Sequence, residues 1–436
     1  MRIDSIKLKN FRGISDLKLE FHKRTTVIYG INGMGKSAVL EACNILFSKI
    51  LSETAMDMGI GKCLITERDV KVGETDTEIR GEFSDGGETY SYYRKRREGK
   101  NTHNSGLLQE LAQHLRERYV GEIISEEEDE EHSAGIEKRK LLWENDSSMP
   151  IYVFYGVNRY IEGRRYLRKK YAGNSGKLDA WRDDIFDGVI DFSVFFEWFR
   201  SRQEYENSIK IEENTFVDPQ LEAARAAILK ALGGQFSSVR IRILEDEAEL
   251  VLVKNGTELS VRQLSEGEKS VIALAGDIAR RLSIANPDNE DILSAEGIVL
   301  IDEIDLHLHP LWQAVILTTL METFVNLQFI VTTHSSKVLS EAGEEIGILK
   351  LEMREGAVEA CAIPPLKGWD VNTILEEYME TASMNQDTKE KISRMFALIE
   401  ESKLAEAEQI ADELERMTDS ENLSVVRARV LIARGR

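Results

Sequence analysis

A glycine-rich octet near the start of the chain limits its fold more than any other segment. Residues 30–37 read Gly-Ile-Asn-Gly-Met-Gly-Lys-Ser, after the β-branched, apolar run 25–29 and before the helix-forming run 38–42. A strand, a glycine loop and a helix in this order aim the first N–H groups of the helix at an anion, because these groups have no partners within the helix. The spacing G-x-x-x-x-G-K-[ST] is typical of loops that wrap nucleotide phosphates. The sequence therefore predicts an α/β fold around a nucleotide site.

The residues of this loop have separate expected roles. Lys36 would reach the β- and γ-phosphate oxygens, and the Ser37 hydroxyl would bind Mg²⁺. The backbone of the loop and of the first helical turn would surround the phosphates. The expected nucleotide contacts are Gly30, Asn32, Gly33, Met34, Gly35, Lys36, Ser37 and Ala38.

Size and charge narrow the class of protein. The chain has 436 residues, of which 42% are hydrophobic, and a formal net charge of −21. This charge repels nucleic acid at long range, which disfavours a general DNA-coating role but permits a local basic groove. No apolar run approaches the roughly 20 residues that span a bilayer, and the first residues lack the apolar stretch of a signal peptide. We therefore expect a cytoplasmic protein without membrane contact, with reduced thiols at Cys43, Cys63 and Cys361.

Residue patterns predict the secondary structure coarsely. Strands are expected at 3–8, 17–21, 25–29, 151–155, 298–301 and 329–331, hairpins at 78–94 and 239–253, and helices at 107–118, within 179–232, from about Ser265 and beyond Pro365. The segment 95–148 is charged and weakly periodic, and is interpreted as an insertion with an acidic loop at 126–131. Five aromatic residues recur at helical spacing and are interpreted as core, namely Phe192, Phe195, Phe196, Trp198 and Phe199.

Two apolar strands end in residues suited to phosphoryl chemistry. The run 298–301 delivers Asp302 and Glu303 to the carboxyl end of a strand, where open α/β sheets bind their ligands. Asp302 would hold Mg²⁺, and Glu303 would polarise the attacking water. The alternative is an acidic pair that caps the following helix. His334 follows the strand 329–331 and could donate to the γ-phosphate, although a lone histidine is usually structural.

A second predicted anion site begins a helix near residue 265. The segment 264–270 reads Leu-Ser-Glu-Gly-Glu-Lys-Ser, so that Ser265 and the Gly267 N–H lie at a helix N-terminus. A single phosphate tail does not need two such sites from one subunit. A two-fold dimer explains why the chain has two anion sites, because each subunit would then offer its serine to the ATP of the partner. The alternative is that Ser265 and Glu268 form an ordinary capping box. The cap and the phosphate contact can also exist at the same helix end.

Together these motifs resemble the ABC-type ATPase heads of the SMC, RecF and OLD group. The resemblance covers about residues 1–120 and 235–360 and rests on the phosphate loop, Leu-Ser-Glu-Gly-Glu, Ile-Asp-Glu-Ile-Asp and Thr-Thr-His. It implies a P-loop NTPase fold, namely an ABC-type head whose mixed sheet carries an antiparallel lobe, with a compact helical insert and a helical C-terminal tail. It also implies ATP and Mg²⁺ as cofactors. In the dimer, Ser265, Gly267 and Glu268 of one subunit would complete the ATP site of the other, which is called the composite site below.

The resemblance assigns further residues. The segment Leu-Lys-Asn-Phe-Arg-Gly at 8–13 looks like the N-terminal strand of the group, whose arginine reaches the phosphates, and this role passes to Arg12. Asp305 matches an aspartate that communicates across the dimer. His307 and His309 are interpreted as helix-entry residues and not as a metal site. Related heads complete the Mg²⁺ shell with a glutamine, which the segment 154–159 lacks, so the residue that replaces it is open.

We expect four parts along the chain. Residues 1–120 would form the N-terminal lobe of the head, 121–235 the acidic loop and helical insert, 236–365 the C-terminal lobe, and 366–436 a helical tail that could dock a partner. The sequence lacks the long arms of SMC rods and the acidic set of a two-metal nuclease after His334.

This organisation resembles the ATPase subunit of Septu-type anti-phage systems (PtuA), whose nuclease is a separate HNH protein (PtuB). The resemblance implies a slow, regulatory ATPase without its own nuclease site, which forms a homodimer or an assembly of dimers and controls an HNH partner. The alternative is a RecF-like DNA-repair clamp, which the basic residues 94–97 and Arg159, Arg164, Arg165, Arg168, Lys169 and Lys170 would favour. A third hypothesis is a pure ATP sensor in which turnover hardly matters.

Overall fold

The computed structural model describes two compact units, residues 1–368 and residues 369–436. The description covers residues 1–435 except 23, 57–62, 121, 126–138, 143–147, 158–175, 182–185, 187, 245–246, 382–385 and 419–422. The predicted acidic loop at 126–131 and the basic residues between 159 and 170 lie outside the described residues. In the described part of the chain, no helix is both long enough and apolar enough to span a membrane.

The larger unit is built on a six-stranded sheet that carries the phosphate loop. Its order is β16-β15-β3-β14-β13-β9, with all neighbours parallel except β15 and β16. The strands are β3 (Thr25–Gly30), β9 (Ile151–Tyr155), β13 (Gly297–Ile301), β14 (Leu327–Thr332), β15 (Ile346–Arg354) and β16 (Ala357–Ile363). Strands β9, β13 and β14 are buried along their whole length, as their unbroken apolar runs require of central strands.

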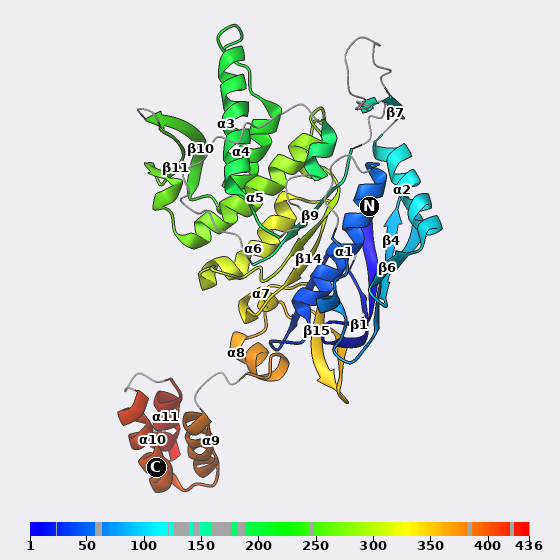
Figure 1. Ribbon diagram of the computed structural model, residues 1–436. Helices are drawn as coiled ribbons and strands as arrows, with labels where there is room; N and C mark the ends of the chain where they lie inside the picture. Colours follow the sequence, from blue (N-terminus) through cyan, green and yellow to red (C-terminus); the bar gives the residue numbers. More distant parts are fainter. Residues whose placement is uncertain are drawn as a thin grey trace. The chain divides into compact units, whose positions relative to one another are not determined.

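Strands β15 and β16 were not expected from the sequence. Strand β15 pairs in parallel with β3, so that Leu351 lies opposite Gly30. The carboxyl ends of the parallel neighbours β3, β13 and β14 therefore meet at one edge of the sheet (Figure 1).

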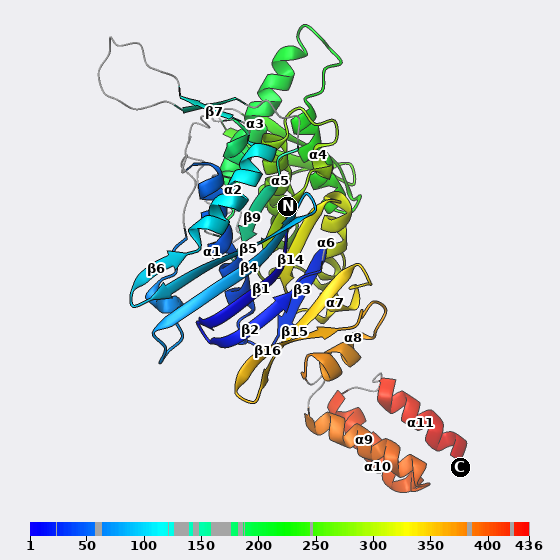
Figure 2. The same cartoon turned by 90° about the vertical axis from the view of Figure 1, so that its right-hand side faces the viewer.

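A second, antiparallel sheet forms the N-terminal lobe, as predicted. Its order is β2-β1-β4-β5-β6, and its strands are β1 (Arg2–Phe11), β2 (Ile14–Glu20), β4 (Asp76–Asp85), β5 (Glu88–Arg97) and β6 (Lys100–His103). The predicted hairpin turn at 85–87 is present between β4 and β5. Helix α1 (Lys36–Thr54) lies between this sheet and the six-stranded sheet and packs on both (Figure 2).

The basic run 94–97, which would favour the clamp hypothesis, does not present all four of its side chains on one surface. Arg94 is buried on the inner face of β5 and donates to the carbonyl oxygens of Ile45 (2.7 Å) and Cys63 (2.5 Å). The alternation of a strand forces this result, because the four residues of a consecutive run point to opposite faces. Lys95 forms an ion pair with Asp76 at 3.2 Å.

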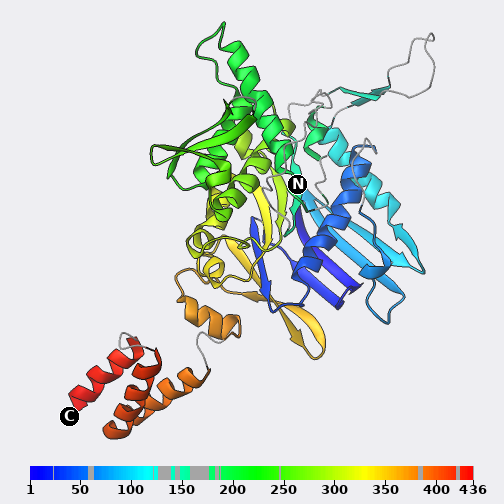
Figure 3. The ribbon, with the colours of Figure 1, turned by 60° about the vertical axis from the view of Figure 1, so that its left-hand side comes forward.

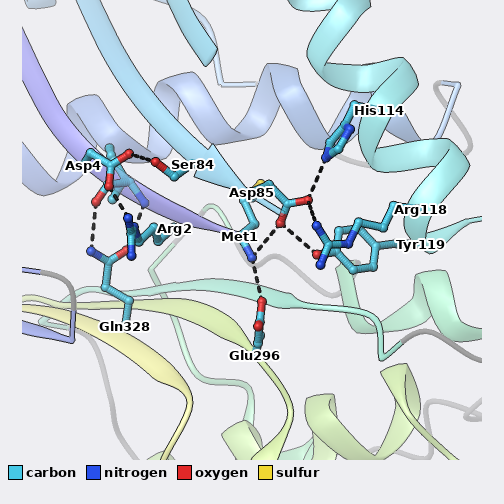
Figure 4. Close-up of polar contacts among 11 residues, drawn as sticks. Met1, Arg2, Asp4, Ser84, Asp85, His114, Arg118, Tyr119, Glu296 and Gln328 are labelled. Carbon is cyan, nitrogen blue, oxygen red and sulfur yellow. Dashed lines mark hydrogen bonds and ion pairs between the residues drawn. The ribbon is translucent and has the colours of Figure 1, made fainter. Parts of the chain in front are cut away.

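Polar contacts fix the N-terminal lobe to the core sheet (Figure 4). The Gln328 side chain of β14 accepts from the Ile3 N–H at 2.9 Å and donates to its carbonyl at 2.8 Å. The amino group of Met1 lies 2.9 Å from both Asp85 and Glu296. Burial alone would raise the pKa of Asp85, but this amino group and the hydrogen bonds from Tyr119 and His114 lower it below its ordinary value.

A helical layer with a small sheet lies on the other side of the core (Figure 3). It contains α3 (Phe192–Ile209), α4 (Pro219–Ala231), α5 (Glu266–Ala285) and the sheet of β10 (Phe236–Leu244), β11 (Glu247–Lys254) and β12 (Thr257–Ser260). The five aromatic residues of α3 are all buried, which confirms their interpretation as core. Tyr155 of β9 donates to Asp277 of α5 at 2.9 Å, and the same carboxylate binds Arg280 and Arg281.

The remaining elements of the larger unit are short or peripheral. They are α2 (Ser105–Tyr119), which matches the helix predicted at 107–118, the hairpin β7 (Glu122–Ser125) and β8 (Arg139–Leu142), α6 (Pro310–Thr323) and α7 (Ser336–Ser340). The smaller unit contains α8 (Val371–Thr373), a π-helical turn at Ile374–Tyr378, α9 (Gln386–Glu400), α10 (Leu404–Thr418) and α11 (Leu423–Gly435). Its core is formed by Met395, Leu398, Ala407, Ala411, Leu414, Val425, Ala428 and Ile432. The C-terminal region is therefore helical, as expected.

Candidate nucleotide site

The phosphate loop leaves the start of α1 open. Gly35 is the N-cap of α1, with φ at +87°, and no described side chain caps this helix end. By contrast, α2, α3, α4, α5 and α6 each begin with a side chain that accepts a backbone N–H. Gly30 is required because a Cβ there would lie 2.3 Å from the Leu351 carbonyl oxygen. The first N–H groups of α1 are thus available to an anion.

Lys36 is buried beside this helix end. Its Nζ donates to the carbonyl oxygens of Gly30 (2.9 Å) and Ile31 (3.2 Å), and the residue is only 6% exposed. Burial lowers the pKa of Lys36 below its ordinary value, against the opposing effect of the carboxylates of Asp302, Glu303 and Asp305. An ammonium group held in this way is placed to bind phosphate oxygens.

Thr332 connects the two acidic residues that follow β13. Its hydroxyl donates to Asp302 Oδ1 at 2.6 Å and accepts the Glu303 N–H at 2.7 Å. Asp302 is buried, and Glu303 adopts a left-handed backbone with φ at +49°. Sequence reasoning missed Thr332, although its place at the end of an apolar strand beside His334 was a usable signal.

The loop after β13 contacts the loop after β14 within the same chain. Asp305 Oδ1 accepts from the Thr333 hydroxyl at 2.5 Å and from the His334 N–H at 3.2 Å. His334 is half-buried at this junction. His309 is the N-cap of α6, where its Nδ1 accepts from Leu311, so its interpretation as a helix-entry residue is confirmed.

Arg12 lies in the β1–β2 turn, next to α1. It binds Glu41 of α1 and, at 3.0 Å, Asp69. Arg12, Glu41, Asp69 and Asp302 line one cavity of about 470 Å³. Arg12 therefore lines the same cavity as Asp302, as its expected role requires. Its guanidinium is paired with two carboxylates, so contact with phosphate would require it to release one of them.

The segment in place of the glutamine is described only in part. Gly156 and Val157 follow β9 and line the same cavity as Asp302. Gly156 donates to the Gly188 carbonyl at 2.7 Å. Asn158 and Arg159 lie outside the described residues, so the group that replaces the glutamine stays open.

The start of α5 is capped by its own side chains. The Ser265 hydroxyl donates to Glu268 Oε2 at 2.8 Å and accepts the Glu268 N–H at 3.3 Å, while the Ser265 N–H donates to the same carboxylate at 2.9 Å. Glu268 also accepts a hydrogen bond from Lys254 Nζ at 2.5 Å. Gly267 packs against the His307 carbonyl, since a Cβ there would lie 3.5 Å from it.

The structure brings one group of the expected residues together and leaves another apart. Lys36, at the open end of α1, lies close enough to Asp302, Glu303 and Asp305 for their charges to act on it, and His334 donates its N–H to Asp305. In the described part of the chain, Ser265, Gly267 and Glu268 make no hydrogen bond with the phosphate loop. Within one protomer, no described hydrogen bond therefore joins the two predicted anion sites.

These residues fit ATP and Mg²⁺. An uncapped helix end with a buried ammonium group suits a polyphosphate, and carboxylate and hydroxyl oxygens suit Mg²⁺, which prefers oxygen ligands. Ser37, partly exposed at the first turn of α1, and Asp302 are the residues that would hold the metal.

Comparison with known proteins places the chain in a family. Residues 25–340 match the family described as "AAA domain, putative AbiEii toxin, Type IV TA system". The "Retron Vc95 probable ATPase" of Vibrio cholerae serotype O1 biovar El Tor is 30% identical over 391 residues, which cover 79% of this chain and 72% of that protein. The chain belongs to this AAA domain family.

Two further matches extend the comparison. The Septu protein PtuA of Bacillus thuringiensis is 25% identical over 386 residues, which cover 86% of this chain and 84% of that protein. The SMC head domain from Thermotoga maritima matches with a TM-score of 0.42 and 18% identity, and covers 83% of this chain and 99% of that one. The Septu protein PtuA and a retron protein named as a probable ATPase are thus among the relatives of this chain, as the Septu resemblance indicated for PtuA.

Proposed function

We propose that this chain binds and hydrolyses ATP, dimerises around two ATP molecules and thereby controls a partner nuclease of HNH type in anti-phage defence. The relatives named for retron and Septu systems support the defence assignment. The expected dimer interface would join the open end of α1 in one protomer to Ser265 and Gly267 of its partner.

The observation that carries this proposal is the contrast between the two helix ends. The start of α1 has no capping side chain and holds a buried lysine, so a polyphosphate supplies what the fold leaves unsatisfied. The start of α5 is already capped by Ser265 and Glu268, and no described contact joins it to the site at α1. A dimer uses both.

Hydrolysis would proceed at the carboxyl ends of β13 and β14. Glu303 accepts a proton from water while the water oxygen bonds to the γ-phosphorus and the bond to the β-phosphate oxygen breaks, releasing ADP. Lys36 stabilises the charge that develops on the phosphate oxygens, and His334 donates to the γ-phosphate. Mg²⁺, held by Ser37 and Asp302, would neutralise phosphate charge when bound. Turnover would be slow, as suits a regulatory switch.

The direct test is the Glu303→Gln variant. The loss of the general base is expected to lower kcat by roughly 10²–10⁴-fold while ATP binding persists. The variant should therefore accumulate an ATP-bound dimer, visible by light scattering coupled to size exclusion. Turnover close to that of the original chain would exclude Glu303 as the base. A monomer with ATP would exclude the dimer, and full biological output from Glu303→Gln would favour the pure ATP sensor.

Control of a nuclease needs a separate test. An HNH protein encoded beside this chain should co-purify with it, and its cleavage of DNA should change between ATP and no nucleotide. Lys36→Ala should abolish that response. A nuclease whose rate ignores both the nucleotide and the variant would contradict the regulatory part of the proposal.

One observation favours the second candidate function, a DNA clamp. A cleft of about 560 Å³ between α3, α4 and β10 is lined by five basic side chains and two carboxylates, Glu204 and Glu206. The basic residues are Arg200, Lys210, Arg225, Arg240 and Arg242. Several of them are paired with glutamates, as Arg242 is with Glu249 at 2.7 Å. Duplex binding that falls steeply with salt and is lost in Arg240→Ala/Arg242→Ala would support the clamp.

A further inference from the structure

The cap of α5 uses the hydroxyl that the dimer would need. Ser265 Oγ donates its only proton to Glu268 at 2.8 Å, so it has none to offer a phosphate in this arrangement. Contact between Ser265 and the ATP of a partner therefore requires the hydroxyl to leave Glu268. When it leaves, the carboxylate loses one of its donors.

A carboxylate at this position also opposes the approach of a triphosphate. Glu268 lies in the first turn of α5, next to the Gly267 N–H, and its side chain is only 8% exposed. Burial alone would raise the pKa of Glu268, but the hydrogen bonds from Lys254 and Ser265 lower it below its ordinary value, so the group is ionised. Two buried anions close together repel strongly unless a cation lies between or beside them.

Lys254 is the cation that lies beside the Glu268 carboxylate. It is the last residue of β11, and its Nζ lies 2.5 Å from Glu268 Oε1, the oxygen that Ser265 does not use. The ammonium group also lies 5.3 Å from the centre of the Phe236 ring, a buried residue at the start of β10. The ammonium group of the neighbouring Lys269 is paired with Glu266 at 2.8 Å. Lys254 thus holds Glu268 from the side away from Ser265.

We propose that Lys254 is a positioning residue of the composite ATP site: it retains and neutralises Glu268 while Ser265 exchanges that carboxylate for a phosphate oxygen of the partner's ATP. This inference rests on the proposed ATP-dependent dimer and adds to it a residue from a different strand. In this exchange the Ser265 hydroxyl keeps its proton. Its hydrogen bond changes from a carboxylate acceptor to a phosphate acceptor, and no covalent bond breaks. Spacing along the chain did not indicate Lys254, because it precedes Glu268 by 14 residues.

The test measures ATP-dependent dimerisation in a Glu303→Gln background. Lys254→Met should raise the ATP concentration for half-maximal dimer by at least about tenfold, since it leaves a buried carboxylate unpaired beside the phosphate. Binding of a fluorescent ATP analogue to the monomer should stay within twofold, which also shows that the variant is folded. Lys254→Arg should retain most of the dimer, because the charge remains.

A second variant separates charge compensation from a structural role. Adding Glu268→Gln to Lys254→Met should restore dimerisation to the level of Glu268→Gln alone, because no charge is left to neutralise. Lys391→Met is the matched control, since Lys391 also forms a 2.5 Å ion pair and is 32% exposed, against 30% for Lys254. It should have no effect.

Three results would overturn the inference. One is normal dimerisation of Lys254→Met, and another is a double variant as defective as Lys254→Met alone; each leaves the dimer proposal intact. The third is a Glu303→Gln parent that stays monomeric with ATP, which would overturn the proposed function together with this inference.

Discussion

Helices α1 and α5 begin in opposite ways, although both are expected to bind phosphate. The start of α1 is formed by Gly35, with no capping side chain and a buried ammonium group beside it. The start of α5 is satisfied by Ser265 and Glu268 and supported by Lys254. The first end needs a ligand, whereas the second is complete without one.

This difference suggests an order of events. The first N–H groups of α1 have no competitor for an anion, so ATP can bind a monomer there. At α5, a phosphate must compete with an internal carboxylate, and binding becomes favourable only when a partner presents it with many other contacts. The predictions below test this contrast, from the largest expected effect to the smallest.

The largest effect is expected at α1. Lys36→Ala should weaken ATP binding to the monomer by at least about 10²-fold, because the charge-assisted bonds of a buried ammonium group to phosphate are lost. Isothermal titration calorimetry measures this. Lys49→Ala, a lysine of the same helix that is paired with Glu53, is the control and should bind ATP normally. Equal affinities for the two variants would remove the special role of the α1 start.

A bulky cation at the α5 start should affect only the dimer. Ser265→Arg is expected to abolish ATP-induced dimerisation while monomeric ATP binding stays within about twofold, because Ser265 is exposed and makes no described hydrogen bond to the phosphate loop. Analytical ultracentrifugation with and without ATP resolves the two states. If binding to the monomer disappears as well, the shared-site arrangement is wrong.

A smaller change should distinguish capping from phosphate contact. Ser265→Ala removes an N-cap and should lower the free energy of unfolding by about 1 kcal/mol. Asn104→Ala removes the N-cap of α2 and should lower stability by a similar amount. Only Ser265→Ala should also weaken ATP-dependent dimerisation. A matching loss of dimer in Asn104→Ala would mean that reduced stability, and not a phosphate contact, is responsible.

The smallest effect concerns pH. The pKa of Glu268 is lowered in the fold, so its stabilising contribution is present above the pKa of the unfolded chain, about 4.3, and is lost as pH falls through the lower folded-state value. The stability difference between the original chain and Glu268→Gln should stay constant from about pH 8 to 5.5 and shrink below about pH 4. Urea denaturation across this range tests the sign. A difference that grows on acidification would contradict it.

Local patterns were sufficient to predict the elements around α1. Strand β3, the glycine loop and the apolar strands β13 and β14 each show their structure in consecutive residues, and the antiparallel hairpins show alternation. Strands β15 and β16 were missed because Gly347, Lys350 and Glu359 interrupt their apolar runs. Long-range pairing leaves little signal in a single sequence.

The side-chain contacts of the site were harder to predict than its motifs. The run 94–97 suggested a basic groove, but strand alternation places Arg94 inside. Thr332 and Lys254 were missed because their roles depend on neighbouring strands and not on spacing along the chain. The motifs indicate which residues meet a nucleotide, whereas tertiary packing decides which groups hold those residues in place.

Mixing two defective chains tests the shared site most directly. Lys36→Ala and Ser265→Arg, each in a Glu303→Gln background and carrying different fluorophores, should each fail to dimerise with ATP. When combined, one α1 start with Lys36 and one α5 start with Ser265 remain intact on opposite chains. We predict an ATP-dependent energy-transfer signal from the mixed pair alone. Absence of this signal, with each chain folded and Ser265→Arg still binding ATP, would contradict a site built from two protomers.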